Sequence, residues 1–239
     1  MTESRRAFFE SSEFSFSSAL LQHFDAVHEE AQVVLDRFLL LQFRFPHLFL
    51  TTNAGVKGHR GMFYFVMAGM DVGRNLELCP RSADALRTIP GLVNAAFYLL
   101  GPQTHILPHT GICTAVMRAH LGVICPPDCV LRIGTEQRSW NDRQLLFFDD
   151  TLEHEAWNGS TRWRVVLNFD FFHPAEPPGG QALLRELRRQ QIALTTAEHP
   201  WYVAAGVRTD RDLMDVMADA PAPNPTVAAL VHSNGLFFC

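Results

Sequence analysis

The sequence predicts a mainly β fold with flanking helices, arranged as a sandwich or a double-sheet barrel. Short runs rich in β-branched and aromatic residues recur from residue 95 onward, and turn residues separate them. These runs cover 95–100, 115–123, 130–134, 144–149 and 163–172. Helical patterns lie before and after this region. Several short strands at such spacing are typical of sandwiches and barrels rather than of alternating strand–helix units.

Residues 1–60 predict an N-terminal helical and irregular segment. Apolar residues between Ala19 and Phe43 recur with a period close to 3.6, which indicates an amphipathic helix. Glycine, asparagine and lysine in 51–61 predict a loop, and 62–66 then reads as a short buried strand. A second helix is expected over 80–86, and Ile89-Pro90-Gly91 ends that part of the chain.

The run from Arg164 to Phe171 alternates between polar and apolar residues. Alternation in a strand places successive side chains on opposite faces. Arg164, Asn168 and Asp170 therefore share one face, and the other face carries aliphatic and aromatic residues. We expect one face to meet a core and the other to meet a polar space.

The last part of the chain, 176–239, predicts a C-terminal helical extension and tail. Leucines and an isoleucine lie on one stripe of a helix expected over 181–194, and the proline-rich stretch 219–225 reads as a stiff linker. That helix would cover the barrel or allow a homodimer through the C-terminal helices. The whole chain, 1–239, is expected to form a single domain with its β core in 60–175.

Composition narrows the class of partner. The chain has 239 residues and a net charge of −5, so it exerts no general attraction on phosphate backbones and nucleic acid is not expected as a partner. Its apolar stretches are shorter than the ~20 residues that span a bilayer, so no membrane association is expected. Without a secretory signal pattern, a cytoplasmic location is the expectation.

The five cysteines predict reduced thiols rather than a disulfide framework. Cys125-Pro126-Pro127-Asp128-Cys129 lacks a second ligand pair for zinc, so a simple turn is expected there.

Three residues in the β-rich region have types and an order that suit an iron site. Such a site needs imidazoles from two neighbouring strands and open positions for a co-substrate and dioxygen. His109 and His154 would supply the imidazoles. A turn after His154 returns the chain as the strand that carries Arg164, whose guanidinium could bind a dicarboxylate in a bidentate manner. From residue types alone, ordinary polar residues of a β-sheet explain the same pattern.

Arg118 and His120 are two residues apart on an expected strand, hence on one face and about 7 Å apart. They could address a second carboxylate.

The same region resembles the aspartyl/asparaginyl β-hydroxylase family. The resemblance covers about residues 60–175 and rests on PHTG at 108–111, RxHLG at 118–122, FDDxxEHE at 148–155 and HP at 173–174. Cys79-Pro80 and Ile89-Pro90-Gly91 also look like that family. The resemblance implies a double-stranded β-helix of the jelly-roll or cupin-like type. It also implies a dioxygenase that requires Fe(II), 2-oxoglutarate and O2.

Residue roles follow from the resemblance in the same way. His109 and His154 would hold the iron and be catalytic, and Arg164 would bind the distal carboxylate of 2-oxoglutarate. His120 and Arg118 would lie beside the co-substrate, with Arg118 also near a substrate carboxylate. The resemblance further implies that Gly111 stands where related oxygenases carry an acidic ligand, and that water fills this position.

Two departures from the family pattern concern the substrate. Family members often have Thr-Asn shortly after the glycine, where this chain has Ile112-Cys113-Thr114, and Tyr98 stands where a serine is usual near 2-oxoglutarate. Tyr98 is therefore a further candidate cofactor-binding residue. The expected substrate is a small molecule, an aminoacyl group on a carrier, or a peptide, with acidic amino acids favoured and β-hydroxylation as the reaction.

Two other functions stay open at this point. A ligand set of two histidines leaves room for chloride, so a 2-oxoglutarate-dependent radical halogenase is one alternative. A non-catalytic β-barrel binding module is the other.

The acidic residues beside His154 suggest further roles. By strand alternation, Glu153 and Glu155 point away from the face that His154 uses, so they are not expected to be ligands. A role in holding an imidazole is expected for Asp150.

Overall fold

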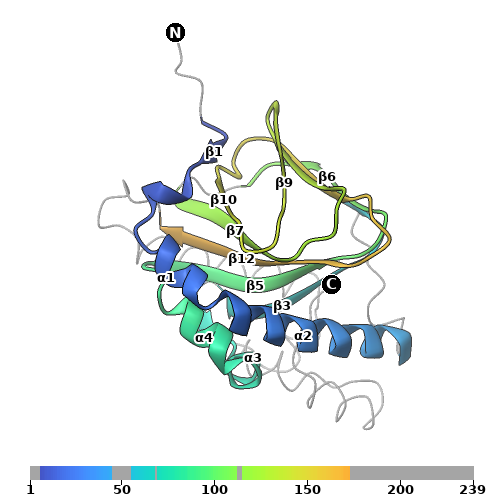
Figure 1. Ribbon diagram of the computed structural model, residues 1–239. Coiled ribbons are helices and arrows are strands. Elements are labelled where there is room, and N and C mark those ends of the chain that lie inside the picture. The colour runs from blue at the N-terminus through green and yellow to red at the C-terminus, as the bar shows by residue number, and fades with distance from the viewer. Residues whose placement is uncertain (1–5, 45–54, 68, 112–114, 173–239) are drawn as a thin grey trace, which may run out of the picture.

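The computed structural model describes residues 6–44, 55–67, 69–111 and 115–172. Two antiparallel sheets face each other, and helices cover the outer face of the larger one (Figure 1). The mainly β double-sheet core with flanking helices is therefore confirmed. The expected helix 181–194, the tail and any dimer contact through them lie outside the described residues.

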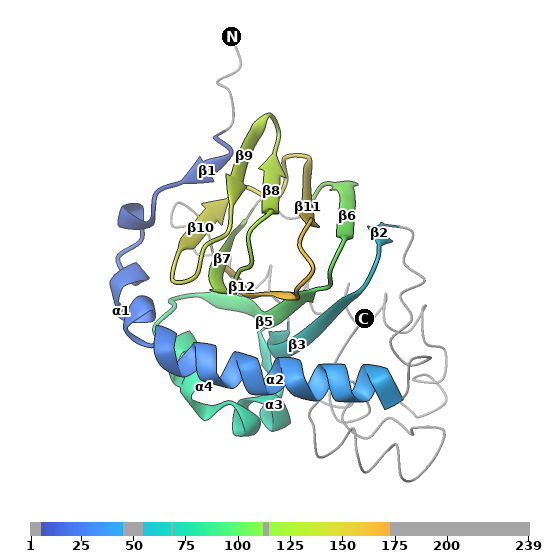
Figure 2. The ribbon, with the colours of Figure 1, turned by 45° about the vertical axis from the view of Figure 1, so that its right-hand side comes forward.

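The larger sheet has seven strands. In spatial order they are β1 (Phe8–Phe9), β10 (Leu145–Phe148), β7 (Val116–Ile124), β12 (Arg164–Phe172), β5 (Leu92–Leu100), β3 (Arg60–Met67) and β4 (Met70–Asp71). The smaller sheet has five strands, in the order β2 (Val56–Lys57), β6 (Thr104–His109), β11 (His154–Asn158), β8 (Cys129–Ile133) and β9 (Glu136–Ser139). Figure 2 shows the smaller sheet lying over the larger one.

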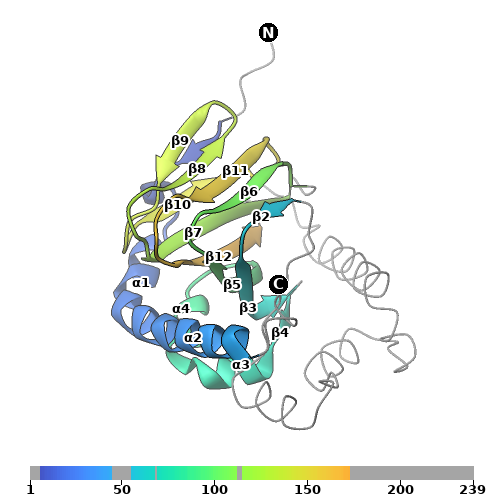
Figure 3. The same cartoon turned by 90° about the vertical axis from the view of Figure 1, so that its right-hand side faces the viewer.

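The helices lie on the other side of the larger sheet, so the layers run helix, sheet, sheet (Figure 3). They are η1 (Ser11–Glu13), α1 (Ser17–Gln22), α2 (Phe24–Arg44), α3 (Gly73–Leu78) and α4 (Pro80–Leu86). The amphipathic pattern of 19–43 is correct in type, but the chain breaks at His23 into α1 and α2. No helix in the described part of the chain is long and apolar enough to cross a membrane.

Strand alternation divides the interior into two cores. One face of the larger sheet, including Leu167, Phe169 and Phe171 of β12, packs with α1, α2 and α4 in a large aromatic and aliphatic core. The opposite face turns towards the smaller sheet and forms a second, smaller core with Leu131, Ile133 and other residues. The prediction that β12 has one core face and one polar face is confirmed, because Arg164, Asn168 and Asp170 point away from the helices into the space between the sheets.

The predicted strands at 62–66, 95–100, 115–123, 130–134, 144–149 and 163–172 correspond to β3, β5, β7, β8, β10 and β12. The predicted helix over 80–86 is α4, which begins with proline at its first turn. The turn at 125–129 joins β7 to β8, and Cys79, Cys125 and Cys129 are free thiols as expected. The short edge strands β1, β2, β4 and β9 were not predicted, and neither were the ranges of β6 and β11, the strands that carry His109 and His154.

Candidate active site

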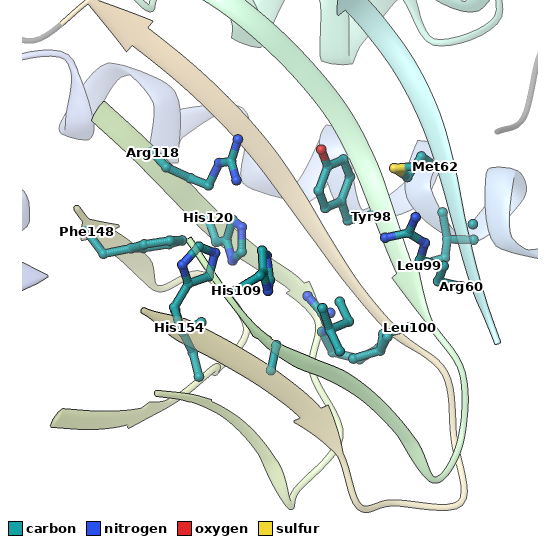
Figure 4. A pocket seen from close by; sticks show the side chains of 15 residues that line it. Arg60, Met62, Tyr98, Leu99, Leu100, His109, Arg118, His120, Phe148 and His154 are labelled. Carbon is teal, nitrogen blue, oxygen red and sulfur yellow. The ribbon is translucent and has the colours of Figure 1, made fainter. Parts of the chain in front are cut away.

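A cavity of about 200 Å³ lies between the two sheets. It is smaller than the ~300–1,000 Å³ of typical ligand pockets, which suits a molecule of a few carbon atoms. All six residues singled out from the sequence line it: Tyr98, His109, Arg118, His120, His154 and Arg164. The structure therefore brings the sequence-predicted site residues together around one space (Figure 4).

His109 and His154 lie side by side on neighbouring strands of the smaller sheet. They are paired in the register of β6 and β11, and their ring centroids are 4.1 Å apart. The pairing has a β-bulge, because Ala156 pairs with Ile106 whereas His154 pairs with His109. The extra residue lets Ile106 and His109 both line the cavity. Bulges that re-aim a side chain are common beside active sites.

The backbone sets the tautomer of both imidazoles. Nδ1 of His109 donates to the Leu107 carbonyl at 2.8 Å, and Nδ1 of His154 donates to the Leu152 carbonyl at 2.9 Å. A carbonyl only accepts, so each Nδ1 carries a proton, and Nε2 is the nitrogen left to bind a metal. Metal-binding histidines are typically oriented in this way. Burial also lowers the pKa of His154 to about 4, which keeps the ring neutral near pH 7.

Within the described residues, no group of three or more His, Cys, Asp or Glu side chains is arranged to hold a metal ion. The pair His109 and His154 is thus the donor set that this cavity offers. A pair of imidazole donors suits Fe, Zn, Cu or Ni rather than Mg or Ca.

Arg164 occupies the far end of the cavity. It is 2% exposed, its guanidinium lies over the Trp140 ring at 4.4 Å from the centroid, and burial lowers its pKa to about 10. It therefore remains charged at neutral pH. Its Nε and Nη1 have no hydrogen-bond partner among the described residues. A buried charge without a counterion is costly, so this cation is suited to receive an anion.

Both nitrogens of His120 are engaged by protein groups. The Trp140 indole N–H donates to Nδ1 at 3.1 Å, so Nε2 carries the proton and donates to Asn168 Oδ1 at 3.0 Å. Burial, followed by the charges of Arg164 and Arg118, holds the pKa of His120 well below its ordinary value. His120 is thus a neutral, fixed part of the wall, and it contacts the cavity through the ring.

Arg118 lies in a cluster with two buried aspartates. Its Nε and Nη2 donate to Asp170 at 2.7 and 3.0 Å, and its Nη1 lies 3.0 Å from Asp150. Burial alone would lower the pKa of Arg118, but the two carboxylates outweigh it and hold the pKa well above its usual range. The charge of Arg118 is therefore compensated inside the protein, unlike that of Arg164. Asp150 binds this arginine and not an imidazole, which corrects the expected role of its side chain.

Asp150 also fills the space beside Gly111. A Cβ built on Gly111 would lie 2.5 Å from Asp150 Oδ2, and the Gly111 N–H donates to the Asp150 carbonyl at 2.7 Å. Any side chain at position 111 would have to displace a carboxylate that is paired with Arg118. The glycine is therefore required by this close approach.

Tyr98 projects from β5 into the middle of the cavity (Figure 4). Its hydroxyl lies 3.4 Å from that of Tyr64, and burial raises its pKa, so it stays protonated. The aliphatic residues Ile106, Leu131 and Ala156 face the same region from the smaller sheet. The cavity thus has imidazoles at one end, Tyr98, His120 and aliphatic side chains in the middle, and an uncompensated cation at the other end.

Glu153 and Glu155 do not join the imidazole pair. Both form ion pairs with Arg132, and Glu155 also meets His105 at 2.7 Å. This agrees with the alternation argument.

Two residues that the sequence analysis did not assign to the site contribute to it. Trp140 is buried in the loop before β10, where it supports Arg164 and fixes His120. Arg60 lines the cavity from the first position of β3. The sequence prediction began this strand at Met62, so Arg60 was taken as part of a loop. Extending the alternation back from Met62 and Tyr64 would have found it.

Comparison with known proteins agrees with this geometry. Residues 22–174 match the model of the aspartyl/asparaginyl β-hydroxylase family. The chain is 31% identical over 178 residues to an ornithine lipid ester-linked acyl 2-hydroxylase of Rhizobium tropici, covering 71% of this chain and 62% of that protein. It is 28% identical over 158 residues to the human aspartyl/asparaginyl β-hydroxylase, covering 62% of this chain but 20% of that protein.

Similar solved structures include a predicted oxalate decarboxylase of Thermotoga maritima, with 13% identity and a TM-score of 0.37 over 52% of this chain and 90% of that one. The sequence match extends over most of the region that builds both sheets and includes every residue that lines the cavity. This chain therefore belongs to the aspartyl/asparaginyl β-hydroxylase family of hydroxylases.

Proposed function

We propose that this protein is an Fe(II)- and 2-oxoglutarate-dependent dioxygenase that hydroxylates an unactivated C–H bond. The observation that carries the proposal is the polarity along the cavity, from two imidazoles with available Nε2 atoms to a buried guanidinium without a counterion. 2-Oxoglutarate has matching chemistry, with a keto-acid head that can chelate a metal, two methylene groups, and a second carboxylate.

The donor groups fit the two cofactors. His109 and His154 would hold Fe(II) through Nε2, since each Nδ1 is engaged by a backbone carbonyl. Arg164 would bind the distal carboxylate through the two nitrogens that have no partner among the described residues. When bound, iron, 2-oxoglutarate and O2 together supply the oxidation, in which one oxygen atom enters the substrate C–H bond and the other enters succinate, with release of CO2.

The remaining wall residues would position the co-substrate. Arg164 and Asn168 lie on the same strand, β12, and are about 13 Å apart along it. Asn168 accepts a hydrogen bond from the ring of His120, which holds that ring in place. Ile106, Leu131 and Ala156 border the stretch between the two ends and would exclude water from the methylene groups. Rigid groups placed in advance bind without the cost of ordering them.

The substrate would approach from the imidazole end, where His109 is exposed. We propose a small molecule, an aminoacyl group on a carrier, or a peptide. The relative from Rhizobium tropici, named an acyl 2-hydroxylase, makes a lipid-linked acyl chain a further substrate class to test. Because Asp150 and Asp170 already compensate Arg118, we do not propose that Arg118 alone selects an acidic substrate.

The decisive experiment measures release of succinate from 2-oxoglutarate by the Fe(II)-loaded protein, with each substrate class added in turn. We expect succinate release that needs Fe(II), O2 and 2-oxoglutarate, and a product heavier by one oxygen atom. Activity in chloride-free buffer should equal activity with chloride, whereas a chlorinated product would indicate a halogenase. Absence of Fe(II) binding in an anaerobic titration would indicate a non-catalytic binding module and overturn the proposal.

A further inference from the structure

Arg60 is a second arginine of the cavity wall whose charge no acidic group of that wall compensates. The residues that line the cavity in the described structure include Arg60, Arg118 and Arg164 and no aspartate or glutamate. Arg118 is paired with two aspartates outside this lining. Nε of Arg60 is buried and has no hydrogen-bond partner among the described residues, as is true of Nε and Nη1 of Arg164.

The sheet register places Arg60 and Arg164 in one row. Arg60 pairs with Leu100 across β3 and β5, and Arg164 pairs with the same Leu100 across β12 and β5. Paired residues of neighbouring antiparallel strands point to the same face. Two strand spacings separate their backbones by about 10 Å. Both side chains therefore leave the same face of the sheet, one on each side of Leu100, and all three residues line the cavity.

The backbone before Arg60 is held firmly. The His59 N–H donates to Thr104 Oγ1 at 2.9 Å, and the His59 carbonyl accepts from the Gly101 N–H at 2.7 Å. Gly58 has φ +123° and lies so close to Thr104 that a Cβ would clash with it. This is where the chain crosses from the smaller sheet to the larger one, so Arg60 has a fixed starting point.

The side chain of Arg60 points inward. In Figure 4 it extends from β3 towards Tyr98 of the neighbouring strand and not outward from the sheet edge. Two cations in one small cavity repel each other, and an anion placed between them would remove both the repulsion and the cost of the uncompensated charge.

We propose that Arg60 and Arg164 together bind one carboxylate, the distal carboxylate of 2-oxoglutarate. This inference rests on the proposed function. Arg164, supported by Trp140, contacts the carboxylate from the buried side of the cavity, and Arg60 contacts it from the side at the sheet edge. Arg60 is thereby a specificity residue that favours a diacid over a monoacid of the same length.

The test compares two keto acids on protein loaded with Mn(II), a redox-stable substitute for Fe(II). Calorimetric titration measures the affinity for 2-oxoglutarate and for 2-oxopentanoate, which has a methyl group in place of the distal carboxylate. Arg60→Met should weaken 2-oxoglutarate binding about tenfold, since a charge-assisted hydrogen bond contributes about that much. It should leave 2-oxopentanoate binding unchanged. Arg164→Met should have the same selectivity effect with a larger magnitude.

The double variant tests whether the two arginines share one carboxylate. Groups that bind the same partner are not independent, so the loss in Arg60→Met/Arg164→Met should differ from the product of the two single losses. Arg162→Met is the matched control, because it removes one positive charge from an exposed position two residues before Arg164. A thermal melt without ligand verifies that each variant is folded.

The possible failures are distinguishable. One outcome is that wild-type protein binds 2-oxoglutarate, Arg164→Met weakens this binding, and Arg60→Met behaves like Arg162→Met. The proposal that both arginines bind one carboxylate is then wrong, and the proposed function stands. If the losses of binding free energy in the double variant are additive, the proposal that both arginines bind one carboxylate is also wrong. If wild-type protein does not prefer 2-oxoglutarate to 2-oxopentanoate, the proposed co-substrate itself is wrong.

Discussion

Arg118 and Arg164 line the same cavity. Arg164 is the first residue of β12, and Arg118 of β7 pairs with Asp170 near the other end of β12. The surroundings of the two arginines differ in charge. Arg118 meets Asp150 and Asp170, whereas two nitrogens of Arg164 have no partner among the described residues. A buried cation held by carboxylates can serve the fold without a ligand. A buried cation without a counterion raises the free energy of the ligand-free protein. Binding of an anion beside the cation lowers that free energy. The two arginines thus separate a structural charge from a binding charge.

The imidazole end should produce the largest effect, because it has no substitute donor in the described structure. We expect His154→Ala to weaken Fe(II) binding more than 100-fold, beyond the ~10–100-fold that loss of an outer partner costs. His105→Ala is the matched control, since His105 lies on β6 beside His109 but pairs outward with Glu155. An anaerobic Fe(II) titration measures both. Full iron binding by His154→Ala would contradict the assignment.

The comparison of the two arginines predicts unequal consequences for stability. Arg118→Met leaves Asp150 and Asp170 buried without their cation and should lower the free energy of unfolding by about 3–5 kcal/mol. Arg164→Met removes an uncompensated charge at the cost of its contact with Trp140, and should change the free energy of unfolding by less than about 1 kcal/mol. Urea denaturation without ligands measures both. Equal losses would show that Arg164 has a counterion in the folded protein.

Alternation explains which parts of this site could be predicted from the sequence. In β12 polar and apolar residues alternate apart from Val166, so the inward placement of Arg164, Asn168 and Asp170 followed directly. In β6 alternation fails, because His105 and His109 are an even number of residues apart yet face opposite sides across the bulge. The pairing of His109 with His154 was instead suggested by residue types and their order along the chain, and then by the family motifs. A bulge depends on the partner strand, which one sequence pattern does not reveal.

The contacts between distant segments were not predictable from local pattern. Trp140 follows β9 and reaches both His120 and Arg164, and Asp150 reaches Arg118 of another strand. Each of these partners is an ordinary loop or strand-end residue in the sequence. Their roles arise from burial and charge balance in the folded chain.

The binding role of Arg164 gives a smaller and more specific effect. Arg164→Met should raise the apparent dissociation constant for 2-oxoglutarate at least about tenfold, because a charge-assisted pair of ~1.5–3 kcal/mol is lost. The control Arg162→Met should leave it within about twofold. Steady-state succinate release at varied 2-oxoglutarate measures the effect. An unchanged dissociation constant for 2-oxoglutarate would show that another residue binds the carboxylate. Arg164 would then no longer differ from Arg118 in having a binding role.

The smallest effect concerns His120, which lies between the two ends and is neutral because Trp140 donates to it. Burial, followed by the charges of Arg164 and Arg118, holds its pKa well below the ordinary value. As the pH falls below about 6.5, the unfolded chain binds a proton at this residue that the folded chain does not bind. Stability should therefore be fully present above pH 6.5 and should decrease towards lower pH.

One such group adds at most about 1.4 kcal/mol per pH unit to the slope of stability against pH. In His120→Gln this contribution is absent, so the free energy of unfolding should fall less steeply between pH 6.5 and 5 than in wild-type protein. His59→Gln is the control, because it makes the same substitution at an exposed histidine. Denaturation at several pH values measures the slopes. Parallel curves for wild type and His120→Gln would show that His120 is protonated as readily in the folded protein as in the unfolded chain.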